Sequence, residues 1–172
     1  MSNTNWYKVN LDGSSLGNPS LVGGGGLIRD ETGKWIRGYA RAIGTTTRAA
    51  AELWALRDGI RLCNAIKVQA VLFEFDAKAI VDLLKKDDQA CNSNDNLVAD
   101  CRKGLREIPM VVIRHCYREA NRCTDALARR GAILSQDFVV FLDPPPEVTL
   151  FLNLDSADTL YDHSFAASIS SI

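Results

Sequence analysis

The sequence has no long uninterrupted hydrophobic run and no pair of cysteines at metal-binding spacing. A membrane-spanning helix needs about 18 or more consecutive apolar residues, so no membrane partner is predicted. The five cysteines are odd in number and none belongs to a CxxC pair, which argues against both a disulfide framework and a zinc site. Reduced, packed thiols are therefore expected.

The sequence also lacks an excess of charge of either sign. It has 172 residues, with 20 Lys plus Arg against 21 Asp plus Glu and a net charge of -1, so its composition gives no sign of a strongly basic nucleic-acid binder. Its apolar fraction of 47% and charged fraction of 24% exclude intrinsic disorder and a coiled coil. We expect a soluble intracellular domain, in the nucleus or the cytoplasm, with a monomer favoured.

The N-terminal part of the chain predicts three antiparallel strands. Tyr7, Val9 and Leu11 alternate with polar residues up to Asp12, which is the period of a strand with one buried face. A second strand is expected at 23–28, although its four consecutive glycines suit a strand only where another backbone or a ligand comes close. The sequence DETGK at 30–34 indicates a hairpin turn into a third strand that ends at residue 43.

From residue 49 the hydrophobic spacing becomes helical, as Leu53, Leu56 and Ile60 show. The elements expected next are a helix from 49, a strand at 71–76, a helix at 77–86, a loop at 87–95, a helix at 97–108, a strand at 110–117 and a helix at 119–134. This order predicts an α/β fold, with a five-stranded mixed sheet flanked by helices on both faces. Three successive prolines at 144–146 are expected to end regular structure.

Two of the predicted strands end on a carboxylate, Asp12 and Asp76. If these strands are neighbours, the two carboxylates lie side by side, and their repulsion must be offset by a shared proton or a cation. Glu52 and Asp125, near the starts of two predicted helices, are placed to join them. Oxygen ligands of this kind suit Mg²⁺, with Mn²⁺ as the alternative. Any one of these acids taken alone is explained better by a solvated surface charge.

Four segments of the chain carry a family resemblance: LDGSSLGNPSLVGGGG at 11–26, AELWALRDGI at 51–60, FEFDA at 73–77 and RHCYREANRCTDALARRGA at 114–132. Taken in order, they resemble the ribonuclease H domain family, and within it the plant ribonuclease H-like domains related to retroelement reverse transcriptases. The resemblance implies a ribonuclease H-like domain at 6–134. Residues 135–172 are then a proline-containing, partly irregular extension.

The resemblance implies a divalent-metal-dependent endonuclease that hydrolyses the RNA strand of RNA/DNA hybrids by a two-metal-ion mechanism. His115 lies where many members keep a histidine that assists proton transfer or product release, and a packed strand histidine explains it equally well. The alternative function is a nucleic-acid-binding or interaction domain of this fold with little or no turnover. The family's catalytic and metal-binding carboxylates fall on Asp12, Glu52, Asp76 and Asp125.

The implied contacts with substrate are less complete. Asn18 falls in the turn that touches the minor groove of the hybrid, where 2′-hydroxyls distinguish RNA from DNA. Thr47 matches a threonine that seats a DNA-strand phosphate, and a helix cap is the alternative. Arg48 and Ala49 replace asparagines that hybrid-cutting members keep nearby. The predicted substrate-binding residues are Gly13, Ser14, Asn18 and Thr47.

Two further charged features are left with simpler interpretations. Glu74 shares the strand face of Asp76 and is expected to be a strand-edge charge without a role. Several arginines, among them Arg122 and Arg129, make the C-terminal third locally basic. A phosphate-binding surface and solvated helix charges explain them equally well.

Overall fold

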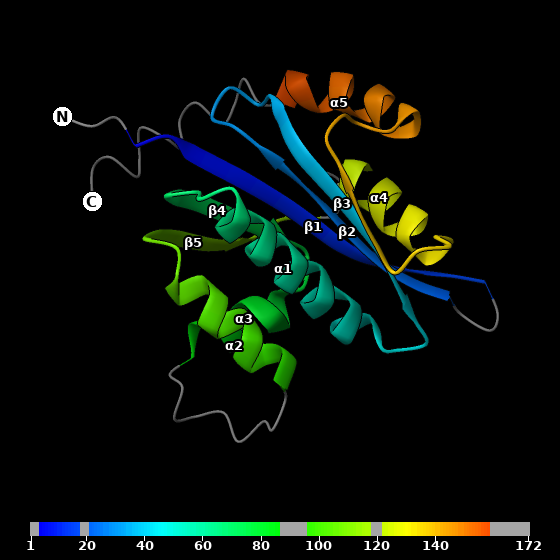
Figure 1. The fold of residues 1–172 in the computed structure, drawn as a ribbon, viewed down its shortest axis with the longest axis horizontal. Coiled ribbons are helices and arrows are strands. Elements are labelled where there is room, and N and C mark those ends of the chain that lie inside the picture. The colour runs from blue at the N-terminus through cyan, green and yellow to red at the C-terminus, as the bar shows by residue number, and fades with distance from the viewer. Residues whose placement is uncertain (1–3, 18–20, 87–95, 118–121, 159–172) are drawn as a thin grey trace.

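A computed structural model describes residues 4–17, 21–86, 96–117 and 122–158 (Figure 1). Within them the chain forms a six-stranded sheet in the order β5-β4-β1-β2-β3-β6. The predicted loop at 87–95 and the predicted first residues of the helix at 119–134 lie outside the described residues. The strands are β1 Trp6–Leu16, β2 Leu21–Arg29, β3 Trp35–Gly44, β4 Ala70–Phe75, β5 Met110–His115 and β6 Phe138–Phe141. The helices are α1 Arg48–Ala65, α2 Lys78–Lys85, α3 Asn96–Arg106, α4 Arg122–Ala132 and α5 Pro146–Asp158.

The sheet is mixed, as the sequence predicts. β1, β2 and β3 pair antiparallel in chain order, whereas β4 pairs parallel to both β1 and β5. The first and fourth strands are therefore neighbours, which confirms the arrangement on which the predicted carboxylate site depends. Because β1 and β4 run in the same direction, their C-terminal ends open at the same end of the sheet.

The prediction of five strands is wrong, because β6 forms a sixth. β6 pairs antiparallel with β3, with Phe138 opposite Arg41 and Phe141 opposite Gly38. Its four residues are too few to show the alternation that marks a strand, so only pairing with β3 reveals it. The prolines at 144–146 do not end regular structure either: Pro146 is the first residue of α5, a position where a missing N–H costs nothing.

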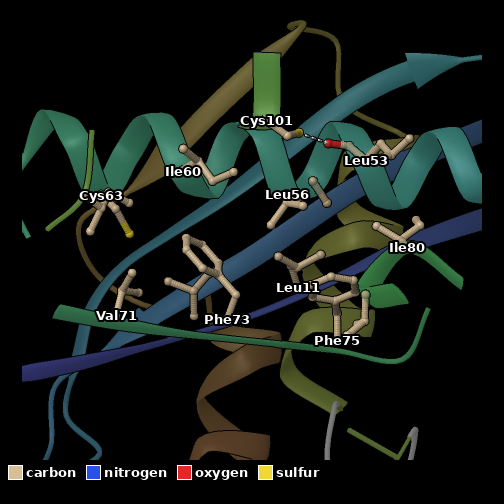
Figure 2. Packing of buried hydrophobic residues seen from close by; sticks show 14 of the residues in the cluster. Leu11, Leu53, Leu56, Ile60, Cys63, Val71, Phe73, Phe75, Ile80 and Cys101 are labelled. Carbon is tan, nitrogen blue, oxygen red and sulfur yellow. Dashed lines mark hydrogen bonds between the residues drawn. The ribbon is translucent and has the colours of Figure 1, made fainter. Parts of the chain in front are cut away.

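The helices cover the two faces of the sheet in separate groups (Figure 1). α1, α2 and α3 pack over the larger hydrophobic cluster, in which Leu56 and Ile60 of α1 meet Phe73 and Phe75 of β4 (Figure 2). α4 and α5 cover the other face through a smaller cluster that includes Leu27 of β2. Val9 and Leu11 of β1 belong to the larger cluster.

The glycines of β2 are required by the close approach of α4. A Cβ atom on Gly25 would lie 2.7 Å from the backbone nitrogen of Ala128, which is closer than real Cβ contacts allow. This confirms that the glycine run is compatible with a strand because another backbone lies against it. The contact also fixes the position of α4, the helix that carries Asp125.

A stack of charged and aromatic side chains joins β6 to α1 and β3. The Arg41 guanidinium lies 5.3 Å from the ring centroid of Trp54 and 4.7 Å from that of Phe138. Its Nε and Nη2 donate to the two carboxylate oxygens of Asp58 at 2.5 and 3.0 Å. The bidentate pair and the stacking geometry are the favoured environment of a partly buried arginine.

The interpretation of Glu74 as a strand-edge charge is wrong. β4 lies between β1 and β5, so Glu74 is buried and its carboxylate must be paired. Lys8 Nζ lies 2.6 Å from its Oε1, and Arg114 Nη2 lies 2.5 Å from its Oε2. Glu74 is thus part of an ion-paired cluster on the sheet.

Across the part of the chain that the structure describes, no helix combines the length and the apolar character needed to cross a membrane.

Candidate active site

Asp12 and Glu52 form a buried carboxylate pair between β1 and α1. Their exposed fractions are 6% and 2%, and the two side chains share a hydrogen bond. The backbone N–H of Gly13 donates to Asp12 Oδ1 at 2.9 Å. α1 lies unusually close to β1 at this point, because a Cβ on Gly13 would lie 2.7 Å from the Cβ of Ala51. This close approach brings Glu52 against Asp12.

Both acids of this pair hold protons more tightly than usual. Burial, and then the neighbouring charge of Asp12, raise the pKa of Glu52 to about 9. Burial also raises the pKa of Asp12, the charge of Asp125 adds to it, and the hydrogen bond with Glu52 opposes it. Glu52 Oε2 is buried and has no hydrogen-bond partner in the described residues. Such a pair is stable with a shared proton or with a cation.

Asp76 follows directly after β4 and is partly exposed. His115, the last residue of β5, has its Nε2 atom 3.6 Å from Asp76 Oδ1. On the other side, Nη2 of Arg48 lies 4.0 Å from Asp76 Oδ2. The His115 and Tyr117 rings form a T-shaped pair, with centroids 5.4 Å apart. Asp76 is therefore flanked by two nitrogen-bearing side chains.

Asp125 lies in the first turn of α4. Nε of Arg129, one helical turn further along, lies 2.9 Å from its Oδ2. Arg129 is exposed and Asp125 is about half exposed, and an ion pair of this kind contributes little to stability. Asp125 is close enough to Asp12 for its charge to raise the pKa of that residue.

Two hollows open beside these carboxylates. The first, of about 550 Å³, is lined by Asp12 and Asp125 and also by Ser14, Thr46 and Arg48. The second, of about 380 Å³, is lined by Glu52 and Asp76 and again by Arg48. Of the buried pair, Asp12 thus lines the first hollow and Glu52 lines the second, and Arg48 lines both.

The four predicted carboxylates are not all in contact with one another. Asp12 and Glu52 touch, whereas Asp76 and Asp125 each border one hollow. In the described residues no three His, Cys, Asp or Glu side chains stand together as one metal-binding group. Mg²⁺ commonly uses only one or two carboxylates and completes its shell with waters and substrate phosphates, so pairs of carboxylates fit that ion.

The predicted substrate-binding residues also differ in position. Gly13 and Ser14 line the first hollow, and Asn18 lies outside the described residues. The Thr47 hydroxyl accepts a hydrogen bond from the N–H of Ala50 at 3.2 Å and caps α1.

The sequence analysis did not assign Thr46 and Arg48 to the site. Both residues flank Thr47, just before the helix that carries Glu52, and Arg48 stands where hybrid-cutting members keep an asparagine, so the sequence held a signal for each of them.

The fold is that of ribonuclease H. The ribonuclease H1 of the archaeon Halobacterium salinarum superposes with a TM-score of 0.64 at 23% identity, covering 73% of this chain and 96% of that one. The N-terminal ribonuclease H domain of a Mycobacterium tuberculosis protein gives 0.65 at 19% identity, with coverages of 74% and 93%. LC11-RNase H1, solved in complex with an RNA/DNA hybrid, gives 0.61 at 23% identity, with coverages of 73% and 96%.

Residues 10–131 match the model of the reverse transcriptase-like family, and the chain belongs to that family. It is also 38% identical over 151 residues to a protein of Arabidopsis thaliana whose name assigns it provisionally to ribonuclease H. That alignment covers 88% of this chain and 24% of the relative. The chain therefore spans about a quarter of the length of its curated relative.

Proposed function

We propose that the chain is a divalent-metal-dependent endonuclease that hydrolyses the RNA strand of RNA/DNA hybrids. The observation that carries this proposal is the buried Asp12–Glu52 pair at the mouth of two hollows, each bordered by one further carboxylate. Two ionised acids with so little solvent contact destabilise the fold unless a shared proton or a cation offsets their charge. A divalent cation at this place would offset both charges.

The residues present fit Mg²⁺ or Mn²⁺. The donors are carboxylate oxygens, which these hard cations prefer, and the buried Glu52 Oε2 has no other partner among the described residues. Asp12 and Asp125 would hold an ion beside the first hollow, and Glu52 and Asp76 beside the second. When bound, such ions activate a water and stabilise the leaving oxygen of a phosphodiester.

The protein's own groups have distinct parts in this proposal. The Gly13 N–H donates to one oxygen of Asp12 and helps to fix its carboxylate, and Asp12 lines the first hollow. Gly13 and Ser14 line that hollow and are placed to contact the sugar-phosphate backbone of a bound strand. His115 lies beside Asp76 and is the candidate for moving a proton at the leaving group.

The relatives support a nuclease that acts on hybrids. LC11-RNase H1 was solved in complex with an RNA/DNA hybrid, and so was the foamy viral protease-reverse transcriptase, which shares the fold with a TM-score of 0.59 at 14% identity. The curated plant relative carries a ribonuclease H name. All three point to nucleic acid as the substrate class and are consistent with the carboxylate site.

Cleavage of an end-labelled RNA/DNA hybrid in Mg²⁺ and in Mn²⁺ tests the proposal. Asp76→Asn should lower the rate by at least about 100-fold, because it removes a charged ligand from the second hollow. The control is Asp143→Asn, which removes an exposed acid two residues after β6, at the opposite edge of the sheet. If the unaltered chain cuts no faster than Asp76→Asn, the proposal fails. Hybrid binding without cleavage would then favour a binding domain of the same fold.

A further inference from the structure

Arg48 occupies a central place beside the carboxylates. It is the first residue of α1, directly after the Thr47 cap, and its side chain is 56% exposed. It borders the hollow that holds Asp12 and Asp125 and also the hollow that holds Glu52 and Asp76. Of the residues that line these two hollows, only Arg48 lines both.

The guanidinium of Arg48 has unused hydrogen-bonding capacity. Its contact with Asp76 is an ion pair at 4.0 Å, which is too long for a hydrogen bond. Within the described residues it has no further polar contact. By contrast, Arg41 donates to Asp58 at 2.5 and 3.0 Å. Arg48 is thus positioned by its backbone but not held by its side chain.

The charge of Arg48 acts across the whole site. It lowers the pKa of Asp12 and of Glu52, against the larger effect of burial. Arg122 and Arg129 line the first hollow with it, but Arg129 is already paired with Asp125. The first hollow therefore contains both the carboxylates that suit a cation and the arginines that suit an anion.

A phosphodiester is the ligand whose chemistry fits both kinds of group. Its non-bridging oxygens accept paired hydrogen bonds from a planar guanidinium, which an ammonium group cannot match in geometry. Phosphate contacts position a nucleic acid without reading its base or its sugar. An arginine at this place therefore supplies affinity that is independent of the type of duplex.

We propose that Arg48 binds a backbone phosphate of the nucleic-acid substrate, next to the carboxylates, and that this contact does not distinguish hybrid from other duplexes. The inference rests on the proposed function only in taking nucleic acid as the ligand. Removing Arg48 should then weaken binding of an RNA/DNA hybrid, a double-stranded RNA and a double-stranded DNA by the same factor.

Fluorescence anisotropy with three labelled duplexes of equal length tests the proposal at a series of salt concentrations. Ca²⁺ replaces Mg²⁺, since it occupies oxygen sites without demanding the octahedral geometry of Mg²⁺. The variants are Arg48→Gln and Arg48→Lys. The control is Arg61→Gln, which removes the same charge from the same helix at a residue that is 58% exposed and pairs with Asp100.

Arg48→Gln should raise the Kd for each duplex about three- to tenfold and should reduce the slope of log K against log salt by about 0.9, the value for one phosphate contact. Arg48→Lys should keep the slope and recover part of the affinity, whereas Arg61→Gln should change neither. Unchanged affinity and slope in Arg48→Gln would overturn the proposal, and so would a loss confined to the hybrid.

These measurements test the phosphate contact of Arg48 separately from the proposed nuclease activity. If the unaltered chain cleaves the hybrid and Arg48→Gln does not change binding, the phosphate contact of Arg48 is refuted and the nuclease activity is supported. If binding depends on Arg48 but no cleavage occurs in Mg²⁺ or Mn²⁺, the phosphate contact is supported and the nuclease activity is refuted. Failure to bind any of the three duplexes overturns both.

Discussion

Asp12 and Glu52 share a hydrogen bond although both are acids and are only 6% and 2% exposed. Their residues belong to different elements, a strand and a helix that meet where Gly13 packs against Ala51. A surface acid loses little by being charged, but these two lose the solvation of their charges and repel each other. The pair therefore links folding stability to pH.

The free energy of unfolding of the metal-free chain should fall as pH rises. Because the pKa of Glu52 is raised from 4.5 to about 9 in the folded state, the folded chain keeps a proton that the unfolded chain has released. The loss should run through the window between pH 4.5 and about 9. Urea unfolding at a series of pH values measures it.

Mg²⁺ should reverse this loss, because its ligands must be deprotonated and its binding therefore strengthens with pH. Adding Mg²⁺ should raise the Tm more at pH 8 than at pH 5.5. Glu52→Gln, which keeps the shape of the side chain, should flatten the pH dependence and weaken the response to Mg²⁺. An equal response of the two chains to Mg²⁺ would contradict the assignment of a cation to this pair.

Gly25→Ala should destabilise the fold by about 3 kcal/mol or more, since its Cβ would lie 2.7 Å from the nitrogen of Ala128 and would push α4 away. Gly24→Ala is the matched control on the other face of β2, where the nearest atom is the flexible Cδ1 of Ile43 at 3.3 Å. It should cost less than about 1 kcal/mol. Chemical denaturation of both variants gives the comparison, and equal losses would refute the role of the glycine.

A chain that ends at residue 134 tests the proposed division between 6–134 and 135–172. It should lose about 3 kcal/mol or more, because Leu27 and Leu127 lose the cover of Val148 and Phe151. Every proposed site residue lies before the cut, so cleavage of the hybrid should persist at low temperature. Loss of activity in a chain that circular dichroism shows to be folded would place part of the site in 135–172.

His115→Ala should lower kcat for hybrid cleavage by about 10²-fold or more if His115 transfers a proton, with a Tm close to that of the unaltered chain. The expected reason is its place beside Asp76, at 3.6 Å. Tyr117→Ala, which removes the ring that His115 contacts, should change kcat much less. A fall in Tm with kcat unchanged would show that His115 is a packing residue.

Much of the architecture could be predicted from local pattern alone. The alternation of Val9 and Leu11 with Asn10 and Asp12 predicts β1 and its buried face, since side chains of a strand alternate. The helical spacing of Leu56 and Ile60 predicts α1 in the same way. β6 could not be found in this manner, because its pairing partner β3 lies about 100 residues earlier in the chain.

The candidate site could likewise be predicted only in part from local pattern. By itself the sequence determined which acids stand at strand ends and helix starts, because those positions follow from local periodicity. Only the tertiary structure decided that Glu52 is buried against Asp12, that Glu74 is paired inside the sheet, and that Arg48 borders both hollows. Burial and charge pairing arise from contacts between segments far apart in the chain, and local spacing carries no information about them.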